Sequence, residues 1–153
     1  MNGVTESLHG IMLSAMGSTV IRTSRLNKKP ILVDLRLPNP PRLRVYIYSL
    51  VGGTGERARH EYKIVLRVPG QAAEAYGAFD HSGSRFTLVI GYRRDLDVFV
   101  IWDASLHPRF KNGGNLQVRD NTVHTAACTG RSDQLRILGG GQKERVIACN
   151  AQL

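Results

Sequence analysis

The chain has 153 residues, of which 42% are hydrophobic and 22% are charged, a balance typical of one globular domain with its own core. Its 21 Lys and Arg against 12 Asp and Glu give a formal charge of +9, which favours a polyanionic partner such as a nucleic acid. No apolar run reaches the roughly 20 residues of a membrane-spanning helix. The N-terminus also lacks the basic stretch of a secretory signal peptide. We therefore expect a single cytoplasmic domain over residues 1–153 with no membrane partner.

The first 29 residues are expected to form a helical segment that packs on a β-rich core of residues 30–153. An amphipathic helix is predicted over residues 5–16, because Leu8, Ile11 and Met12 recur at the spacing of one helix face. Residues 18–29 are ambiguous, and a second short helix is one interpretation of them. The Lys-Lys-Pro cluster at residues 28–30 then ends the segment.

Most of the remaining chain has the alternation and the β-branched or aromatic content of strands. The predicted strands are residues 31–35, 43–48, 61–68, 85–92, 96–102, 135–138 and 144–149. A Gly-Gly-Gly turn at residues 139–141 makes the last two a hairpin. This order predicts an α+β fold with two or three packed helices. Its β part is expected to be a curved, mostly antiparallel β-sheet or a partly open barrel of about seven strands.

One helix is predicted after the middle strands, with Asp120 as its N-terminal cap and Gly130 as its end. Cys128 then lies on this helix and Cys149 in the last strand, both among apolar residues. We expect buried free thiols and no disulfide framework.

The segment of residues 107–115 is the most informative stretch of the chain. It combines Arg109 and Lys111 with Pro108, Phe110 and two glycines, and it follows an apolar run that is predicted to be a buried strand. A rigid strand that presents a basic loop is a common way to build a recognition site. An exposed Phe110 would insert into a groove or stack on a base. The alternative is that Phe110 folds back into the core.

Two groups of candidate DNA contacts follow from the loop and its surroundings. Phosphates are expected to be held by Arg57, Arg59, Lys63, Arg93, Arg109, Lys111 and Arg119. Recognition of a base or of a modified group is assigned to His60, His107, Pro108, Phe110, Asn112, Gly113, Asn115 and Gln117. The alternative for residues 57–60 is a solvated charged turn, and Arg93 has Asp95 nearby as a local partner.

A magnesium-dependent nuclease is an alternative function. Glu61 and Lys63 lie on one face of a predicted strand, and Asp34 lies at the end of another, which matches the acidic and basic groups that many restriction nucleases place around a metal ion. This pattern is short and occurs often by chance. The sequence has no phosphate-binding P-loop and no hydrolase elbow. We therefore predict no catalytic residue, no metal site and no cofactor.

An ordered series of short segments runs along residues 43–149. Its members are residues 61–64, 68–71, 79–80, 88–92, 97–104, 107, 115–118 and 144–148. The series resembles N-terminal reader domains of bacterial modification-dependent restriction proteins, which are often fused to an HNH nuclease. Within that group the chain is similar to sulfur-binding domains that recognise phosphorothioate DNA. The resemblance implies double-stranded DNA as the partner and an HNH nuclease that lies outside this chain.

A phosphorothioate suits the composition of the loop. Sulfur is less strongly hydrated than the oxygen it replaces, so an apolar cavity favours it, whereas a phosphate oxygen there would lose its hydrogen bonds. Pro108 and Phe110 would supply the apolar atoms, and Arg109 and Lys111 would hold the charge. The alternative is a reader of methylated or otherwise modified bases, which would need an aromatic cage or a pocket for a flipped base.

Overall fold

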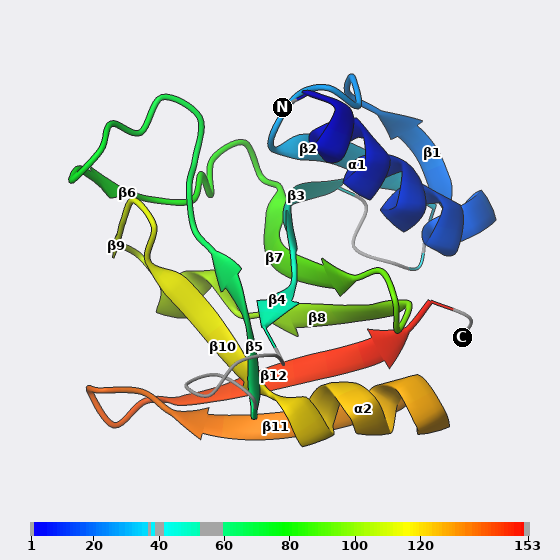
Figure 1. Ribbon diagram of the computed structural model, residues 1–153. Coiled ribbons are helices and arrows are strands. Elements are labelled where there is room, and N and C mark those ends of the chain that lie inside the picture. Colours follow the sequence, from blue (N-terminus) through cyan, green and yellow to red (C-terminus); the bar gives the residue numbers. More distant parts are fainter. Residues whose placement is uncertain (1, 37, 39–41, 53–59, 152–153) are drawn as a thin grey trace.

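The computed structural model describes residues 2–36, 38, 42–52 and 60–151 (Figure 1). Its main feature is a large mixed sheet that has two open edges and is not closed into a barrel. In spatial order, its strands are β1 (Val20–Thr23), β2 (Ile31–Leu35), β3 (Arg42–Ser49), β7 (Phe86–Arg93), β8 (Val98–Trp102), β12 (Lys143–Asn150) and β11 (Arg131–Ile137). The expected α+β fold with a curved sheet is therefore confirmed.

Most pairs of neighbouring strands in the large sheet are antiparallel, and β3 and β7 form a parallel pair. These two strands lie at the centre of the sheet, and their side chains are buried on both faces for most of their length. Burial on both faces explains why β3 contains Val45, Tyr46 and Ile47 in succession instead of strict alternation of apolar and polar residues.

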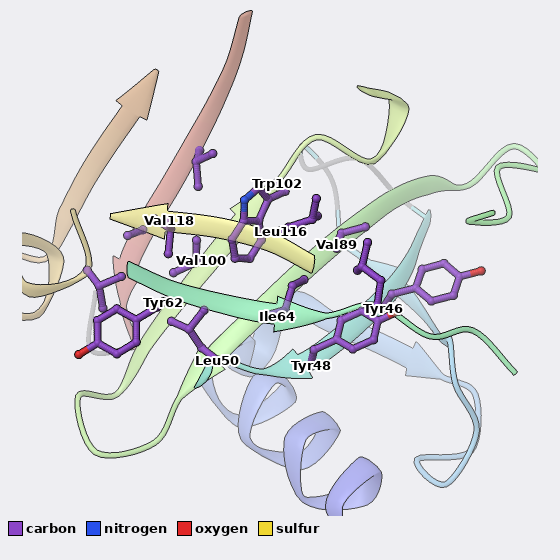
Figure 2. Packing of buried hydrophobic residues seen from close by; sticks show 14 of the residues in the cluster. Tyr46, Tyr48, Leu50, Tyr62, Ile64, Val89, Val100, Trp102, Leu116 and Val118 are labelled. Atoms are coloured by element: carbon purple, nitrogen blue, oxygen red, sulfur yellow. The ribbon is translucent and has the colours of Figure 1, made fainter. Parts of the chain in front are cut away.

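A small sheet packs on one face of the large sheet. Its strands are ordered β10 (Asn115–Arg119), β5 (Glu61–Val65) and β4 (Val51–Gly52). Figure 2 shows the shared core, in which Ile64 and Leu116 of the small sheet face Trp102 of the large one. The expected strand over residues 61–68 ends at Val65, so it is shorter than predicted.

The helices cover opposite faces of the large sheet. Helix α1 (Asn2–Met16) buries Leu8 and Met12 against β2 and β3, in agreement with the predicted apolar stripe. Helix α2 (Asp120–Thr129) buries Val123 and Ala126 in the core that the large sheet shares with the small one. The two helices therefore leave each face of the large sheet only partly covered.

Three local predictions need correction. Residues 17–19 form a 3-10 turn, η1 (Gly17–Thr19), and the chain then continues as the edge strand β1 instead of a second helix. Asp120 is the first residue of α2 and not its cap, whereas Gly130 ends the helix as expected, with φ of 99°. Cys128 is exposed, and Cys149 is partly buried, so the expectation of two buried thiols is wrong for Cys128.

The remaining elements are short and lie in or near the segment of residues 103–114 between β8 and β10, which we call the candidate loop. They are the 3-10 turn η2 (Ala104–Leu106) and the strands β6 (Tyr76–Gly77) and β9 (Phe110–Lys111), which pair to form a separate two-stranded ribbon. No helix in the part of the chain that the structure describes has the length and apolar character needed to cross a membrane.

Gly91 allows the two sheets to pack closely. A Cβ atom at this buried position of β7 would lie 2.7 Å from Cγ2 of Ile64 and 3.3 Å from the Trp102 ring. Gly91→Ala should therefore lower the free energy of unfolding by about 1–3 kcal/mol through overpacking. Urea denaturation measures this loss. Gly140→Ala is the matched control, because no neighbouring atom lies within 4 Å of its Cβ position, and an unchanged stability of Gly91→Ala would contradict the close contact.

Candidate DNA-binding surface

The candidate loop leaves the large sheet at the end of β8 and continues through η2 and β9 into β10 (Figure 1). It therefore joins the large sheet, the β6–β9 ribbon and the small sheet in one segment. Asp103 begins the loop, and its side chain accepts hydrogen bonds from the backbone N–H and the hydroxyl of Ser105, at 3.0 Å and 2.6 Å.

His107 anchors the start of the loop to the core. Its Nε2 lies 2.7 Å from Oε2 of Glu144, a residue of β12 that is fully buried, and the His107 side chain is only 13% exposed. The same carboxylate accepts a hydrogen bond from the backbone N–H of Asp103, and Arg136 of β11 lies 3.8 Å from its other oxygen. His107 is thus a positioning residue for the loop, and most of its ring is turned away from solvent.

Phe110 points into the protein and not outward. It is 8% exposed, and its ring centroid lies 4.7 Å from that of Phe79, which in turn packs 4.9 Å from Tyr46. This aromatic row fixes the ribbon on the core between the two sheets. The exposed apolar contact that the sequence analysis expected from Phe110 is therefore absent, and the alternative of a folded-back Phe110 is confirmed.

Asn112 and Gly113 hold the far end of the loop. The Asn112 side-chain amide donates to the carbonyls of Gln71 and Ala72, and the Gly113 N–H donates to the carbonyl of Leu66 at 3.0 Å. Gly113 has φ of 86°, a conformation that glycine adopts without strain. Both residues therefore form hydrogen bonds within the protein. Contacts with a partner are left to the neighbouring residues of the loop.

Gln71 reinforces the ribbon from the other side. Its amide nitrogen donates to the carbonyls of Ala75 and Phe110, and its amide oxygen accepts from the N–H of Val68. The ribbon is consequently held by side-chain hydrogen bonds at its base and by Phe110 beneath it. This support gives a pair of two-residue strands a defined position.

Tyr76, Arg109 and Lys111 form an exposed cluster on the ribbon, which we call the ribbon cluster. Tyr76 is 52% exposed, and the guanidinium carbon of Arg109 lies 3.6 Å from the centre of its ring. Lys111 is the cross-strand partner of Tyr76, with its Nζ 5.8 Å from the same ring centre. Two cations beside one exposed aromatic ring can contact a phosphate and an apolar group together. Pro108, also exposed, immediately precedes Arg109.

A second group of predicted residues lies on the small sheet. Lys63 of β5 is the cross-strand partner of Gln117, and Asn115 and Arg119 are the exposed ends of β10. Gln117 and Arg119 line a polar pocket of about 360 Å³ between β10 and β11. The Gln117 carbonyl accepts hydrogen bonds from the Trp102 indole and from Arg136. This group lies along β5 and β10, and β10 runs from the β6–β9 ribbon to α2.

Of the other predicted DNA contacts, Arg93 and His60 each lie beside a carboxylate, and two arginines lie outside the described residues. Arg93 donates to both carboxylate oxygens of Asp95, at 2.6 Å and 3.4 Å, and this pairing lowers the pKa of Asp95. His60 is exposed, with its Nδ1 3.6 Å from the carboxylate of Asp120. Arg57 and Arg59 lie outside the described residues.

The structure separates the residues of the nuclease alternative. Asp34 lies in β2 of the large sheet, where Arg85 donates to its carboxylate at 3.1 Å and Arg22 lies 3.3 Å away. Glu61 and Lys63 lie in β5 of the small sheet, and Glu61 is paired across the strands with Arg119. Among the described residues, no group of three or more His, Cys, Asp or Glu side chains could hold a metal ion.

Tyr76 and Glu144 are two residues of the site that were not predicted from the sequence. Tyr76 lies in a stretch without strand or helix periodicity, so nothing in the sequence marked it as an exposed ring beside two cations. Glu144 did carry a signal, because alternation along the predicted strand places it on the same face as the apolar Val146 and Ala148. A carboxylate on a buried face requires a partner, and His107 provides it.

The chain resembles one described protein family. A model of the family described as methylase-associated X1 matches residues 41–152, a region that includes the ribbon cluster and the small sheet. No curated protein and no solved structure gives a significant match. The family match supports the link to modification and restriction systems that the sequence analysis predicted.

The burial of Phe110 has a measurable consequence. Phe110→Ala should lower the free energy of unfolding by about 3–5 kcal/mol, because it leaves a cavity against Phe79. The matched control is Pro108→Ala at the exposed neighbouring position, for which we expect a change within about 0.5 kcal/mol. Thermal or urea denaturation measures both values. Equal, small effects of the two substitutions would show that Phe110 does not support the ribbon.

Proposed function

We propose that this chain, which belongs to the methylase-associated X1 family, is a non-enzymatic reader of double-stranded DNA in a modification or restriction system. The observation that carries the proposal is the ribbon cluster, in which Tyr76, Arg109 and Lys111 are presented together on a two-stranded ribbon. The excess of positive charge over the chain is consistent with a DNA partner.

The shape of the ribbon suits a DNA groove. The major groove of B-DNA admits a two-stranded β-ribbon, and β6 and β9 form such a ribbon on a rigid base. Arg109 and Lys111 would hold phosphates, while Lys63 and Arg119 would extend the contact along the backbone. His107, Asn112 and Phe110 would act indirectly, by holding the ribbon in place.

The finer proposal is that the modified group is a phosphorothioate. Tyr76 takes the apolar role that the sequence analysis gave to Phe110, because its ring is exposed and lies beside Arg109. The exposed Pro108 supplies the second apolar group. Divalent sulfur makes favourable contacts with aromatic rings in proteins, and by analogy a weakly hydrated phosphorothioate sulfur suits this site. Cleavage of the DNA would be performed by an HNH nuclease, fused or separate.

The phosphorothioate proposal predicts discrimination between chemical forms of one duplex. The chain should bind a duplex with one Rp phosphorothioate at least about tenfold more tightly than the unmodified duplex, a difference of about 1.4 kcal/mol. The Sp diastereomer, in which the sulfur and oxygen positions are exchanged, is the matched control and should bind like unmodified DNA. Fluorescence anisotropy measures the three affinities. Equal binding of all three duplexes would refute the phosphorothioate proposal but would still be consistent with DNA binding.

The ribbon cluster also predicts how affinity depends on salt. Neutralisation of four phosphates by Lys63, Arg109, Lys111 and Arg119 gives a log–log slope of about −3.6. Arg109→Ala should weaken binding and reduce the magnitude of that slope by about 0.9. Arg25→Ala, a loss of an exposed cation between β1 and β2, is the control and should change neither value. A slope near zero for the unmodified chain would argue against a DNA partner.

A second candidate function is recognition of a methylated base. The description of the family, which associates it with a methylase, favours this reading. The exposed Tyr76 ring would then stack on the modified base. Tighter binding to a methylated duplex, together with equal binding of the Rp and unmodified duplexes, would establish this candidate over the sulfur reader.

A further inference from the structure

Three arginines surround one aspartate near the β1 edge of the large sheet. Asp34 of β2 accepts a hydrogen bond from Arg85 at 3.1 Å, and Nε of Arg22 and Nε of Arg42 lie 3.3 Å and 4.0 Å from the same carboxylate. We call these four residues the arginine cluster. Because one carboxylate balances only one guanidinium, the other two positive charges of the cluster are left without a counterion inside it.

The pairing of the edge strands creates the cluster. Asp34 is the cross-strand partner of Arg22 on β1 and of Arg42 on β3, so the three side chains form a row across the sheet. The register shifts between Val20 and Arg22, where two steps along β1 correspond to one step along β2. This bulge turns Arg22 towards the face of Asp34, whereas Val20 packs on the α1 side.

Two of the three arginines are available to an anion. The Arg85 side chain is only 12% exposed and also donates to the carbonyl of Leu43 at 3.1 Å. The side chains of Arg22 and Arg42 are 77% and 51% exposed, and each approaches Asp34 through its Nε. Among the residues that the structure describes, their terminal Nη groups have no hydrogen-bond partner. Exposed ion pairs contribute little to stability, so stability alone does not explain this row.

The arginine cluster lies on the same face of the large sheet as the ribbon cluster. Along β3, Arg42, Arg44 and Tyr46 alternate with residues that pack against α1, so their side chains lie on the opposite face. Tyr46 packs against Phe79, which contacts Phe110 beneath the ribbon. The face that carries the ribbon therefore continues along β3 to the arginine cluster.

The segment of residues 80–85 connects the two clusters and leads from the ribbon to β7 (Figure 1). Arg44, which is 7% exposed, donates to the carbonyls of Asp80 and Ser82 at 3.1 Å and 2.8 Å. Arg85, at the end of the same segment, reaches Asp34. These hydrogen bonds fix the position of the arginine cluster relative to the ribbon.

The spacing of the two clusters suits a DNA duplex. Four residues of β3 separate Arg42 from Tyr46, which corresponds to roughly 13 Å of extended strand. The major groove of B-DNA is about 12 Å wide. A duplex whose groove holds the ribbon would therefore bring one bordering backbone to the arginine cluster.

We infer that Arg22 and Arg42 bind the phosphodiester backbone that borders the groove occupied by the ribbon. The inference rests on the proposed function, because its ligand is the same duplex, and it adds a phosphate site outside the ribbon cluster and the small sheet. A guanidinium can donate two parallel hydrogen bonds to one phosphate. Asp34 would hold the two arginines in position through their Nε atoms.

Alanine substitutions test the phosphate site with an unmodified duplex of about two helical turns, roughly 20 base pairs. Arg22→Ala and Arg42→Ala should each weaken binding by about fivefold to tenfold at about 0.1 M salt, and each should reduce the magnitude of the log–log salt slope by about 0.9. Arg145→Ala is the matched control, because Arg145 is 65% exposed and also pairs with an aspartate, Asp133, but lies on β12 far from β1. This control should change the affinity by less than about twofold.

The outcomes separate this inference from the proposed function. If Arg109→Ala weakens binding while Arg22→Ala and Arg42→Ala do not, the phosphate site is overturned and the ribbon proposal stands. An equal loss for Arg145→Ala would show an effect of net charge alone and would also overturn the site. If the unsubstituted chain binds no duplex, the inference and the proposed function both fall.

Side-chain NMR tests the contact directly. The Nε–Hε signals of Arg22 and Arg42, assigned through their absence in the two alanine variants, should shift when the duplex is added, because phosphate binding changes their contact with Asp34. The Arg145 signal should stay in place. Shifts at the ribbon cluster together with unchanged signals of both Arg22 and Arg42 would overturn the inference.

Discussion

The contact between Phe110 and Phe79 is the interaction on which the candidate surface depends. The β6–β9 ribbon consists of two residues on each side, and a two-stranded ribbon alone is marginally stable in water. Packing of Phe110 beneath it, in a row that continues to Tyr46, connects the ribbon to the main core. The apolar residue of the loop therefore provides rigidity, and the exposed contacts come from its neighbours.

Polar anchors complete this division of roles. Buried Glu144 holds His107 at the start of the loop, and the carbonyls of residues 66–75 hold Asn112 and Gly113 at its end. With these side chains engaged inward, Arg109 and Lys111 remain exposed beside Tyr76. Pre-organised cations lose less conformational entropy on binding than mobile ones. The arrangement thus favours a specific contact over a diffuse electrostatic one.

Much of the fold follows from the sequence because period-two alternation marks long strands. The strands at 31–35, 43–48 and 144–149, and the closing hairpin, were predicted for this reason. The β6–β9 ribbon was not, since strands of two residues carry no periodicity and their partner is far along the chain. Residues 20–23 form an edge strand through pairing with β2, a tertiary contact that local sequence does not encode.

The candidate site, too, could be predicted from the sequence only in part. The sequence identified the basic loop and most of its cations, but an apolar residue inside a basic loop is compatible with both exposure and burial. The direction of Phe110 depends on Phe79, which precedes β7 and meets the loop only in the folded protein. The pairing of Arg109 with Tyr76 likewise joins distant segments. Because of these tertiary contacts, we propose the apolar contact for Tyr76 and not for Phe110.

The most direct test of the central claim is a titration of the 16.9 kDa chain with duplex DNA, followed by amide chemical shifts in two-dimensional NMR. The account predicts that the largest changes occur at Tyr76, Arg109 and Lys111, with smaller changes along β10. Changes confined to α1, or no change at the ribbon at saturating DNA, would contradict it.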